Sequence, residues 1–336
     1  MKILKRVRIF CILFLVCSAA CRDDLERFGP TGTKNLKNEC LLRTYWPKIA
    51  GEDIEFVYGF AMPYENRNRI LAAWVEASIA GAEGTYMEHR SAHPSASGGD
   101  EWVIVGDPSV TTGTKTEVLF TRDTCAAALR YYWRIPEDAK GQEVSFTFNV
   151  KGSNNETVSY KMGPYAISMI DMARGLALNE TNCYISIEDM AVYDIAEASA
   201  NASKVDLIYL FRNIPYPETS TQSFGHAFVS PVTDADFRKD AQIPTGANNS
   251  TLVRKTYGLR DRHLDFLEPR YDFFATDIDL KSINFSDMPN YALNMYGGES
   301  GMWVETQDGR YRAYIFLNSA IVTGTAVISM KRLKMY

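Results

Sequence analysis

Hydrophobic and polar residues alternate with a period of two along several stretches of the first half of the chain. The runs at residues 54–60, 75–79 and 144–150 each make every second side chain apolar. Because successive side chains of a strand point to opposite faces, this spacing predicts half-buried strands. The run at 144–150 is followed by the turn-forming residues GSNN and a further alternating run, so residues 143–160 are expected to form a β-hairpin.

The second half shows a different mixture of patterns. Residues 205–211, VDLIYLF, are apolar enough to predict a strand buried on both faces, and the alanine-rich residues 193–203 predict a short helix. The Asp308-Gly309 turn predicts a hairpin within residues 301–317. The last pattern, residues 326–334, predicts a terminal strand with Val327, Ser329 and Lys331 on one face and Ile328 and Met330 on the other.

These patterns predict an all-β protein with minor α content, built from two antiparallel β-sandwich domains. About 315 residues follow the N-terminal segment, which is more than one hydrophobic core usually holds. Residues 40–165 are expected to form an immunoglobulin-like sandwich, because an aromatic strand passes through a proline into a short loop before the next strand. Residues 166–336 are expected to form a second β-rich sandwich with short helices, after turn residues near Gly163 and Pro164.

The N-terminus has the pattern of an export signal. Residues 1–20 carry a basic patch, an apolar run at 9–16 that is far shorter than the ~20 residues of a transmembrane helix, and small residues directly before Cys21. This resembles a lipoprotein signal peptide, so Cys21 is the predicted lipidation site and residues 21–39 a tether. Ser18 departs from the usual pattern and leaves ordinary secretion open. The acidic cluster after Cys21 resembles the export tag of Bacteroidota surface lipoproteins, which predicts an outer membrane lipid anchor facing the cell exterior.

Charge argues against nucleic acid as a binding partner, and the number of cysteines argues against a disulfide framework. Removal of residues 1–20 leaves 32 basic against 41 acidic residues, a net charge of −9, and an acidic protein without basic stripes does not favour nucleic acid. The remaining cysteines besides Cys21 are Cys40, Cys125 and Cys183. This odd number favours buried thiols over a disulfide framework, while a single bridge between Cys40 and Cys125 stays open.

The four histidines give no catalytic or metal site. His89 and His93 are four residues apart, but the segment SAHPSASGG at residues 91–99 is expected to be a flexible loop rather than a zinc-binding helix. His226 has Ser230 nearby but lacks the G-x-S-x-G motif, so we expect a buried, hydrogen-bonded histidine. His263 lies among charged residues and is expected at the surface or at an interdomain contact.

Two pairs of carboxylates are candidates for glycoside hydrolysis, which needs two facing acids. Asp277 and Asp279 would share one side of a strand if that segment is extended, and Glu299 and Glu305 flank Trp303. Neither context demands catalysis. Phosphate-binding, dinucleotide-binding and calcium-loop motifs are also missing from the sequence. We therefore expect a protein that is not an enzyme, with no catalytic residues, no metal and no cofactor.

Aromatic residues beside irregular loops supply the candidate ligand contacts. Trp303 follows Gly297, Gly298 and Gly301 and is expected to be exposed, with Tyr296 and Glu305 nearby. Flat rings combine apolar area with a polar handle and can stack on sugar faces. The predicted ligand-binding residues are therefore Trp303, Tyr296 and Glu305.

Several longer stretches resemble an uncharacterised Bacteroidota family, the domain-of-unknown-function family numbered 4466. They are ALRYYWRIPEDAKGQEVSFTF, GHAFVSP, KVDLIYLF, WVETQDGRYRAYIF and ISMKRLK. The resemblance implies a gut-type surface lipoprotein and offers no catalytic residues. More broadly, the chain looks like the accessory glycan-binding lipoproteins of polysaccharide-utilisation systems. The expected function is non-catalytic binding of a glycan or glycoprotein at the cell surface. The alternatives are a structural or adhesive protein that binds partner proteins and a divergent glycoside hydrolase.

Overall fold

A computed structural model describes residues 35–63, 67–95, 97–215, 223–267 and 273–336. The predicted signal peptide, Cys21 and most of the predicted tether lie outside these residues. Every pairing between the named strands is antiparallel and helices are few and short, which confirms the predicted all-β fold class. Within the described ranges, none of the helices is both long and apolar enough to cross a membrane.

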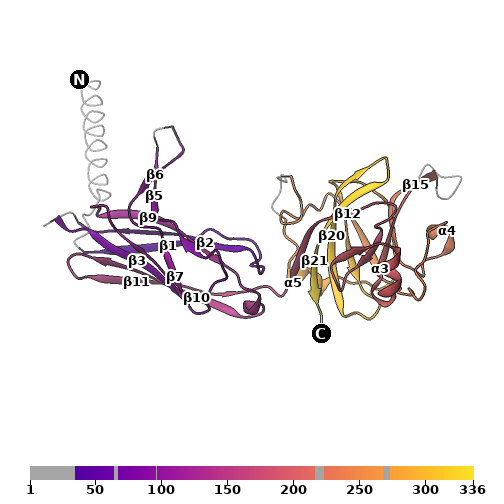
Figure 1. Ribbon diagram of the computed structural model, residues 1–336, viewed down its shortest axis with the longest axis horizontal. Helices are drawn as coiled ribbons and strands as arrows, with labels where there is room; N and C mark the ends of the chain where they lie inside the picture. The colour runs from indigo at the N-terminus through magenta and orange to yellow at the C-terminus, as the bar shows by residue number, and fades with distance from the viewer. Residues whose placement is uncertain (1–34, 64–66, 96, 216–222, 268–272) are drawn as a thin grey trace, which may run out of the picture.

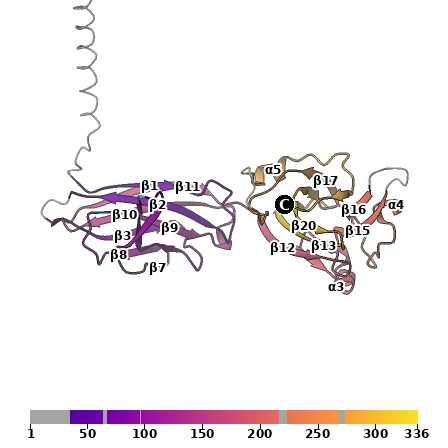
Figure 2. The same cartoon turned by 90° about the horizontal axis from the view of Figure 1, so that it is seen from above.

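Two groups of sheets lie end to end along the long axis of the molecule (Figures 1 and 2). The first group has two packed sheets and a separate hairpin, β5 (Arg90–Pro94) with β6 (Asp100–Ile104). One sheet has the order β1 (Lys37–Leu42), β2 (Asp53–Ala61), β9 (Ala126–Arg134), β4 (Tyr86–Met87). The other has the order β11 (Thr157–Ala166), β10 (Glu143–Gly152), β3 (Ile70–Ala77), β8 (Lys115–Leu119), β7 (Val110–Thr112).

This arrangement is compatible with an immunoglobulin-like sandwich. The order β1-β2-β9 facing β11-β10-β3 corresponds to strands A-B-E facing G-F-C of that fold. Alternation along β2 and β10 buries Phe56, Tyr58, Phe146 and Phe148 between the sheets, with Trp133 beside them. The predicted hairpin at residues 143–160 is confirmed by the pairing of β10 with β11.

The region around His93 differs from the expectation. A flexible loop was predicted there, but β5 and β6 pair from Arg90 with Ile104 to Pro94 with Asp100. His89 lies just before this hairpin, and its Nδ1 is 3.4 Å from Glu88 Oε1. Strand pairing therefore accounts for the segment on both sides of the serine- and glycine-rich turn.

The second group also contains two sheets. The outer sheet has the order β12 (Asp171–Leu178), β21 (Thr325–Lys334), β20 (Tyr311–Ile321), β19 (Ser300–Glu305), β17 (Leu252–Tyr257). The sheet packed against it has the order β14 (Ala191–Tyr193), β13 (Tyr184–Ser186), β15 (Leu207–Pro215), β16 (Ser223–Val229), β18 (Tyr291–Met295). The helices of this group are α3 (Ile195–Ala200), α4 (Ala235–Arg238) and α5 (Asp277–Ser282), with a 3-10 turn at Ala202–Lys204. Another 3-10 turn, Glu137–Ala139, lies between β9 and β10 of the first group.

Several local predictions for this half are confirmed. The helix predicted within residues 193–203 is α3, whose start is fixed by a capping box between Asp194 and Glu197. The Asp308-Gly309 turn joins β19 to β20. The predicted strand VDLIYLF contains the first residues of β15, whose side chains from Leu207 to Leu210 are all buried.

The sheet containing β20 is buried on both faces. Ile315 and Leu317 pack into the core between the two sheets, whereas Tyr314 and Phe316 pack outward under α5 and the chain around it. This outer core also includes Ile49 from the first group of strands. It therefore joins the two halves of the molecule.

Two residues discussed from the sequence, His263 and Asp277, make contacts at this junction. The His263 ring lies 6.4 Å from the Trp46 ring and 4.7 Å from the Phe274 ring, so the expected interdomain contact is confirmed. Asp277 accepts hydrogen bonds from Ser168 Oγ and, at 3.0 Å, from the Met169 amide. Burial beside Lys331 and neighbouring arginines lowers the pKa of His263 to about 3.

Asp277 and Asp279 were expected on one side of a strand, and this expectation is wrong. Both lie in the first turn of α5, where Thr276 and Asp279 form a capping box. A carboxylate in this position accepts from free amides at the helix start, so the Asp-rich segment favours a helix over a strand. These two carboxylates hold the helix and the junction together.

Candidate functional site

One end of the second sandwich collects the ends of strands from both sheets. Tyr257 of β17 pairs with Ser300 of β19, and β20 and β21 continue until Ile321 pairs with Thr325. In the other sheet, Phe211 of β15 pairs with His226. The Phe211 ring packs so closely on Gly324 that a Cβ there would lie 3.2 Å from it. The end of β15 and the turn between β20 and β21 are therefore neighbours. We call this end the groove end.

A solvent-facing groove of about 860 Å³ opens there. This volume lies in the range of ligand-binding clefts, about 300–1,000 Å³. Its lining combines amide, hydroxyl and charged side chains with three aromatic residues, Tyr184, Tyr209 and Phe211. The polar and aromatic side chains along the lining include Asn179, Asn182, Tyr184, Phe211, Arg212, Asp240, Gln242, Thr323 and Thr325.

The aromatic wall of the groove is held by its neighbours. The half-buried Phe211 ring lies 4.7 Å from the His226 ring and packs on Gly324, whose φ of +88° and close approach both require glycine. Beside it, Arg212 donates from Nε to Asp240 Oδ1 at 2.9 Å and from Nη1 to the Phe211 carbonyl at 2.8 Å. The guanidinium group is thus oriented before any ligand arrives.

The groove lining also includes a cysteine with a neutral thiol, Cys183. Burial raises the pKa of the Cys183 thiol to about 11, so the neutral thiol dominates at neutral pH. Tyr184 donates from its hydroxyl to the Gln242 carbonyl at 3.0 Å, which fixes the chain segment that carries Asp240. Cys40 is also buried and Cys125 half-buried, and all three cysteines are free thiols.

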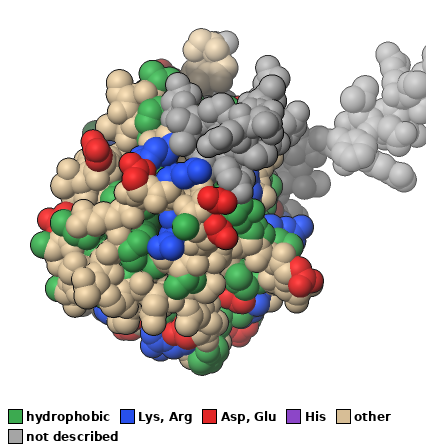
Figure 3. Space-filling view, turned by 90° about the vertical axis from the view of Figure 1, so that its right-hand side faces the viewer, with side chains coloured by type: hydrophobic (Ala, Val, Ile, Leu, Met, Phe, Trp, Pro, Cys, Tyr) green, Lys and Arg blue, Asp and Glu red, His purple; other side chains and the backbone are tan. Residues whose placement is uncertain are grey.

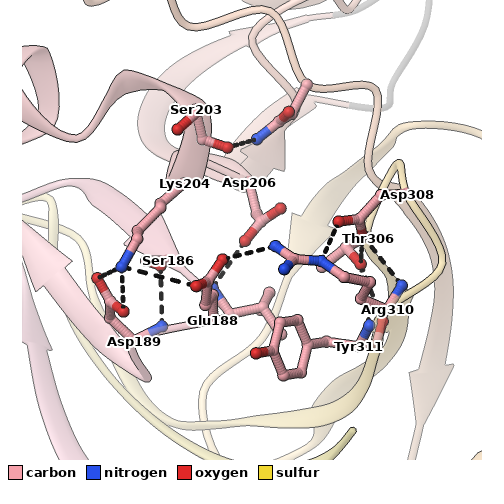
Figure 4. A network of polar contacts seen from close by, with 12 residues as sticks. Ser186, Glu188, Asp189, Ser203, Lys204, Asp206, Thr306, Asp308, Arg310 and Tyr311 are labelled. Atoms are coloured by element: carbon pink, nitrogen blue, oxygen red, sulfur yellow. Dashed lines mark hydrogen bonds and ion pairs between the residues drawn. The ribbon is translucent and has the colours of Figure 1, made fainter. Parts of the chain in front are cut away.

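The opposite end of the same sandwich carries a network of paired charges (Figure 4). Glu188 lies between Lys204 and Arg310, at 3.7 Å from Lys204 Nζ and 2.9 Å from Arg310 Nη2. Lys204 also contacts Asp189 at 2.8 Å, and Arg310 contacts Asp308. Glu188, Lys204, Asp308 and Arg310 border a cavity of only about 150 Å³. We call this region the network end.

Asp206 is the most deeply buried acid of the network end. Its carboxylate accepts from the Ile187 amide at 2.8 Å and from Thr251 Oγ1 at 3.1 Å. Burial, with Asp308 and Glu188 nearby, raises the pKa of Asp206 to about 7. In the described ranges, His, Cys, Asp and Glu side chains do not form a group of three or more that could hold a metal ion.

The structure separates the three ligand-binding residues predicted from sequence. Trp303 was expected to be exposed, but it is only 5 % exposed and packs against Tyr314 with ring centroids 4.4 Å apart. It faces the outer core because the chain around α5 covers this face of β19. Glu305 forms an ion pair with Arg312 at 2.7 Å. Tyr296 is 52 % exposed and lies at the groove end.

His226 and Ser230 do not form a nucleophile and base. His226 is 8 % exposed, with Nδ1 2.7 Å from the Tyr209 hydroxyl, and burial lowers its pKa. Ser230 donates instead to the Thr251 carbonyl at 2.8 Å. The histidine is therefore buried and hydrogen-bonded, as predicted.

Sequence reasoning missed Phe211, Arg212 and Asp240. Phe211 belongs to an apolar run that reads as core, and Asp240 lies about thirty residues away in an irregular segment. The available signal was the arginine that directly follows VDLIYLF, because a charge ending a buried strand marks the point where the strand leaves the core.

Charged groups of both signs are interspersed on the face of the second half that points away from the first (Figure 3). The side chains that line the groove likewise include one arginine against two acids, Glu180 and Asp240. The groove therefore offers individual hydrogen-bonding groups and ring faces rather than a field of one sign.

The fold and the groove define an antiparallel β-sandwich protein with a solvent-facing polar cleft. Residues 33–167 match the family described as Domain of unknown function (DUF4466), and residues 168–335 match Domain of unknown function (DUF8576). The crystal structure of a DUF4466 family protein from Parabacteroides merdae ATCC 43184 is 40 % identical with a TM-score of 0.82, over 90 % of this chain and 100 % of that chain. The chain belongs to the DUF4466 family.

A second solved structure shares much less. The major pilin subunit BcpA of Bacillus cereus is 9 % identical with a TM-score of 0.28, over 47 % of this chain and 45 % of that chain. This similarity is too low to inform function. No curated protein matches the chain.

Proposed function

We propose that this protein is a lipid-anchored surface protein that captures a glycan in the groove of its second sandwich, without cleaving it. The observation that carries the proposal is the side-chain set of the groove, in which the Phe211 ring adjoins the oriented Arg212–Asp240 pair and the amides of Asn179 and Asn182. The anchor is the predicted lipid on Cys21, and the location is the outer face of the outer membrane.

The chemistry of sugars matches this set. A pyranose ring has an apolar face that packs on an aromatic ring, and its hydroxyl groups both donate and accept hydrogen bonds. Arg212 supplies donors, Asp240 supplies acceptors, and asparagine amides supply both. Since Phe211 and Arg212 are held by protein contacts, little side-chain entropy is lost on binding.

The first experiment uses the mature chain on an array of plant and host polysaccharides. We expect the wild type to be retained on at least one polysaccharide with no released sugar. Arg212→Ala should weaken this retention by about 10-fold or more, because a charge-assisted hydrogen bond to the bound sugar is lost. Phe211→Ala should weaken it through loss of the ring face, and the same substitutions should leave the secondary structure intact by circular dichroism.

Arg310→Ala is the matched control. It removes an arginine that pairs with an aspartate, as Arg212 does, but at the network end. Equal loss in both variants, or undiminished retention of Arg212→Ala, contradicts the groove as the site. Released sugar that disappears on mutation of a groove acid would replace capture by hydrolysis.

A protein ligand is the second candidate. The turn between β20 and β21 carries Ile321 and Val322, which are 56 % and 87 % exposed beside the groove. Exposed aliphatic side chains in a polar rim are typical of protein contacts. Failure on every polysaccharide, together with cell adhesion that is lost on Val322→Asp, would favour this candidate.

A further inference from the structure

Two tyrosines at the groove end expose their rings to solvent. Tyr257 ends β17 and is 69 % exposed, and Tyr296 follows β18 and is 52 % exposed. Their ring centroids are 6.4 Å apart with the planes at 89°. Tyr257 lies on the far side of β20 from the groove, since β19 and β17 follow β20 in the sheet, and the Tyr296 ring lies beside it. Neither ring belongs to any of the hydrophobic cores.

The backbone that carries Tyr296 is fixed by hydrogen bonds. Its amide donates to Ser300 Oγ at 2.9 Å, and its carbonyl accepts from the Ser300 amide at 2.9 Å. The next residue, Gly297, lies against β20 so closely that a Cβ would be 2.3 Å from the Ala320 amide nitrogen. This turn is therefore locked onto the strand that leads to the groove.

The chain beside Tyr257 is fixed in a similar way. The Gly258 amide donates to the Glu299 carbonyl at 2.7 Å, which ties the end of β17 to the turn that follows Tyr296. Lys255 donates to the carbonyls of Leu293 and Asn294 at 2.8 and 2.6 Å. Its ammonium group lies 6.0 Å from the centre of the Tyr296 ring. Two exposed rings on such a rigid frame are preorganised for stacking, so their contact costs little entropy.

From this geometry we infer that Tyr257 and Tyr296 form a second sugar-stacking site, and that the ligand is a polysaccharide or long oligosaccharide that contacts this site and the groove together. The inference rests on the proposed function for the groove. From β20, Tyr257 lies two strand positions away, which is about 10 Å at the usual strand spacing, and the Tyr296 ring adjoins it. A disaccharide held in the groove leaves the tyrosines uncovered, whereas a longer chain reaches both sites and gains avidity.

The test compares ligand length rather than ligand identity. The polysaccharide that retains the wild type is compared with its own disaccharide, using titration calorimetry on the mature chain. The Tyr257→Ala/Tyr296→Ala variant should bind the polysaccharide about 10-fold more weakly and the disaccharide unchanged. The Tyr257→Phe/Tyr296→Phe variant keeps the ring faces and should retain most of the wild-type affinity. Tyr86→Ala, which removes a 43 % exposed tyrosine from the first sandwich, should have no effect.

The outcomes separate the two proposals. If Arg212→Ala abolishes binding and the double alanine variant binds the polysaccharide as tightly as the wild type, the tyrosine site is wrong and the groove stands. If the double alanine variant weakens the disaccharide and the polysaccharide equally, the tyrosines belong to the same short site and the length requirement is wrong. If only the tyrosine variants lose binding, the groove is wrong.

Discussion

The two ends of the second sandwich contain similar residues in opposite situations. At the network end, Lys204 and Arg310 are each bound by carboxylates, and the cavity that they border measures about 150 Å³. At the groove end, Arg212 has one carboxylate partner, and its neighbours border about 860 Å³ of open volume. Charged side chains that pair with one another have little hydrogen-bonding capacity left for a ligand. Polar side chains spread along a cleft keep that capacity. The difference leaves the groove end as the candidate binding site and makes the network end part of the packing of the fold.

The outer core contains a fully buried ion pair, in which every charged group has its partners. Lys331 and Asp261 are both 0 % exposed, with Nζ 2.7 Å from Oδ2, and Lys331 also donates to the Ala275 carbonyl at 3.1 Å. Asp261 accepts further from the amides of His263 and Ala275 at 2.8 and 2.6 Å. Burial lowers the pKa of Lys331. This pair fastens the chain around α5 onto β21.

The largest expected effect follows from breaking this pair. Lys331→Met leaves the Asp261 carboxylate buried without its partner and should lower the free energy of unfolding by about 3–5 kcal/mol. The Lys331→Met/Asp261→Asn double variant should lose less, because the uncompensated charge is removed as well. Urea denaturation followed by fluorescence measures both. A single variant within about 1 kcal/mol of the wild type would show that the pair is not what holds this layer.

A smaller effect, which depends on pH, is expected at the network end. The folded-state pKa of Asp206 is raised to about 7 from an ordinary value of 3.8. Because the folded state binds this proton more tightly than the unfolded state, the resulting stabilisation is complete below about pH 4 and is lost as pH rises through about 7. Relative to Asp206→Asn, the wild type should lose about 2–4 kcal/mol between about pH 4 and pH 8.

Urea denaturation of both proteins across this pH range measures the difference. Effects of the other titrating groups largely cancel, since both proteins carry them. A constant difference between the two proteins would mean that Asp206 stays ionised in the fold, in which case the network end is more open to water than its burial implies.

The smallest effect tests the comparison directly. Arg212→Ala and Arg310→Ala each remove a partly exposed ion pair, so each should change the free energy of unfolding far less than Lys331→Met does. Their similar stabilities contrast with the expected difference in glycan retention. A large loss of stability in Arg212→Ala would instead place that arginine among the residues that hold the fold.

Periodicity predicted much of the β structure because it depends only on neighbours in the chain. The alternation at 144–150 and the Asp308-Gly309 turn each became the expected hairpin. Exposure was harder to predict. Trp303 looked exposed from its glycine-rich approach, but the chain around α5, more than twenty residues earlier, covers it. Asp277 and Asp279 failed as strand residues because capping of a short helix outweighed the local alternation.

The sequence alone determined the all-β class, the principal hairpins and the family, because apolar alternation and turn chemistry act over a few residues. Only the tertiary structure decided the site. The groove joins residues 179–184, 208–212, 240–242 and 323–325, which strand pairing and sheet packing bring together from distant parts of the chain. The same packing buried Trp303 and left Tyr257 and Tyr296 exposed. Side-chain burial is set by what another segment places over it, which no local pattern records.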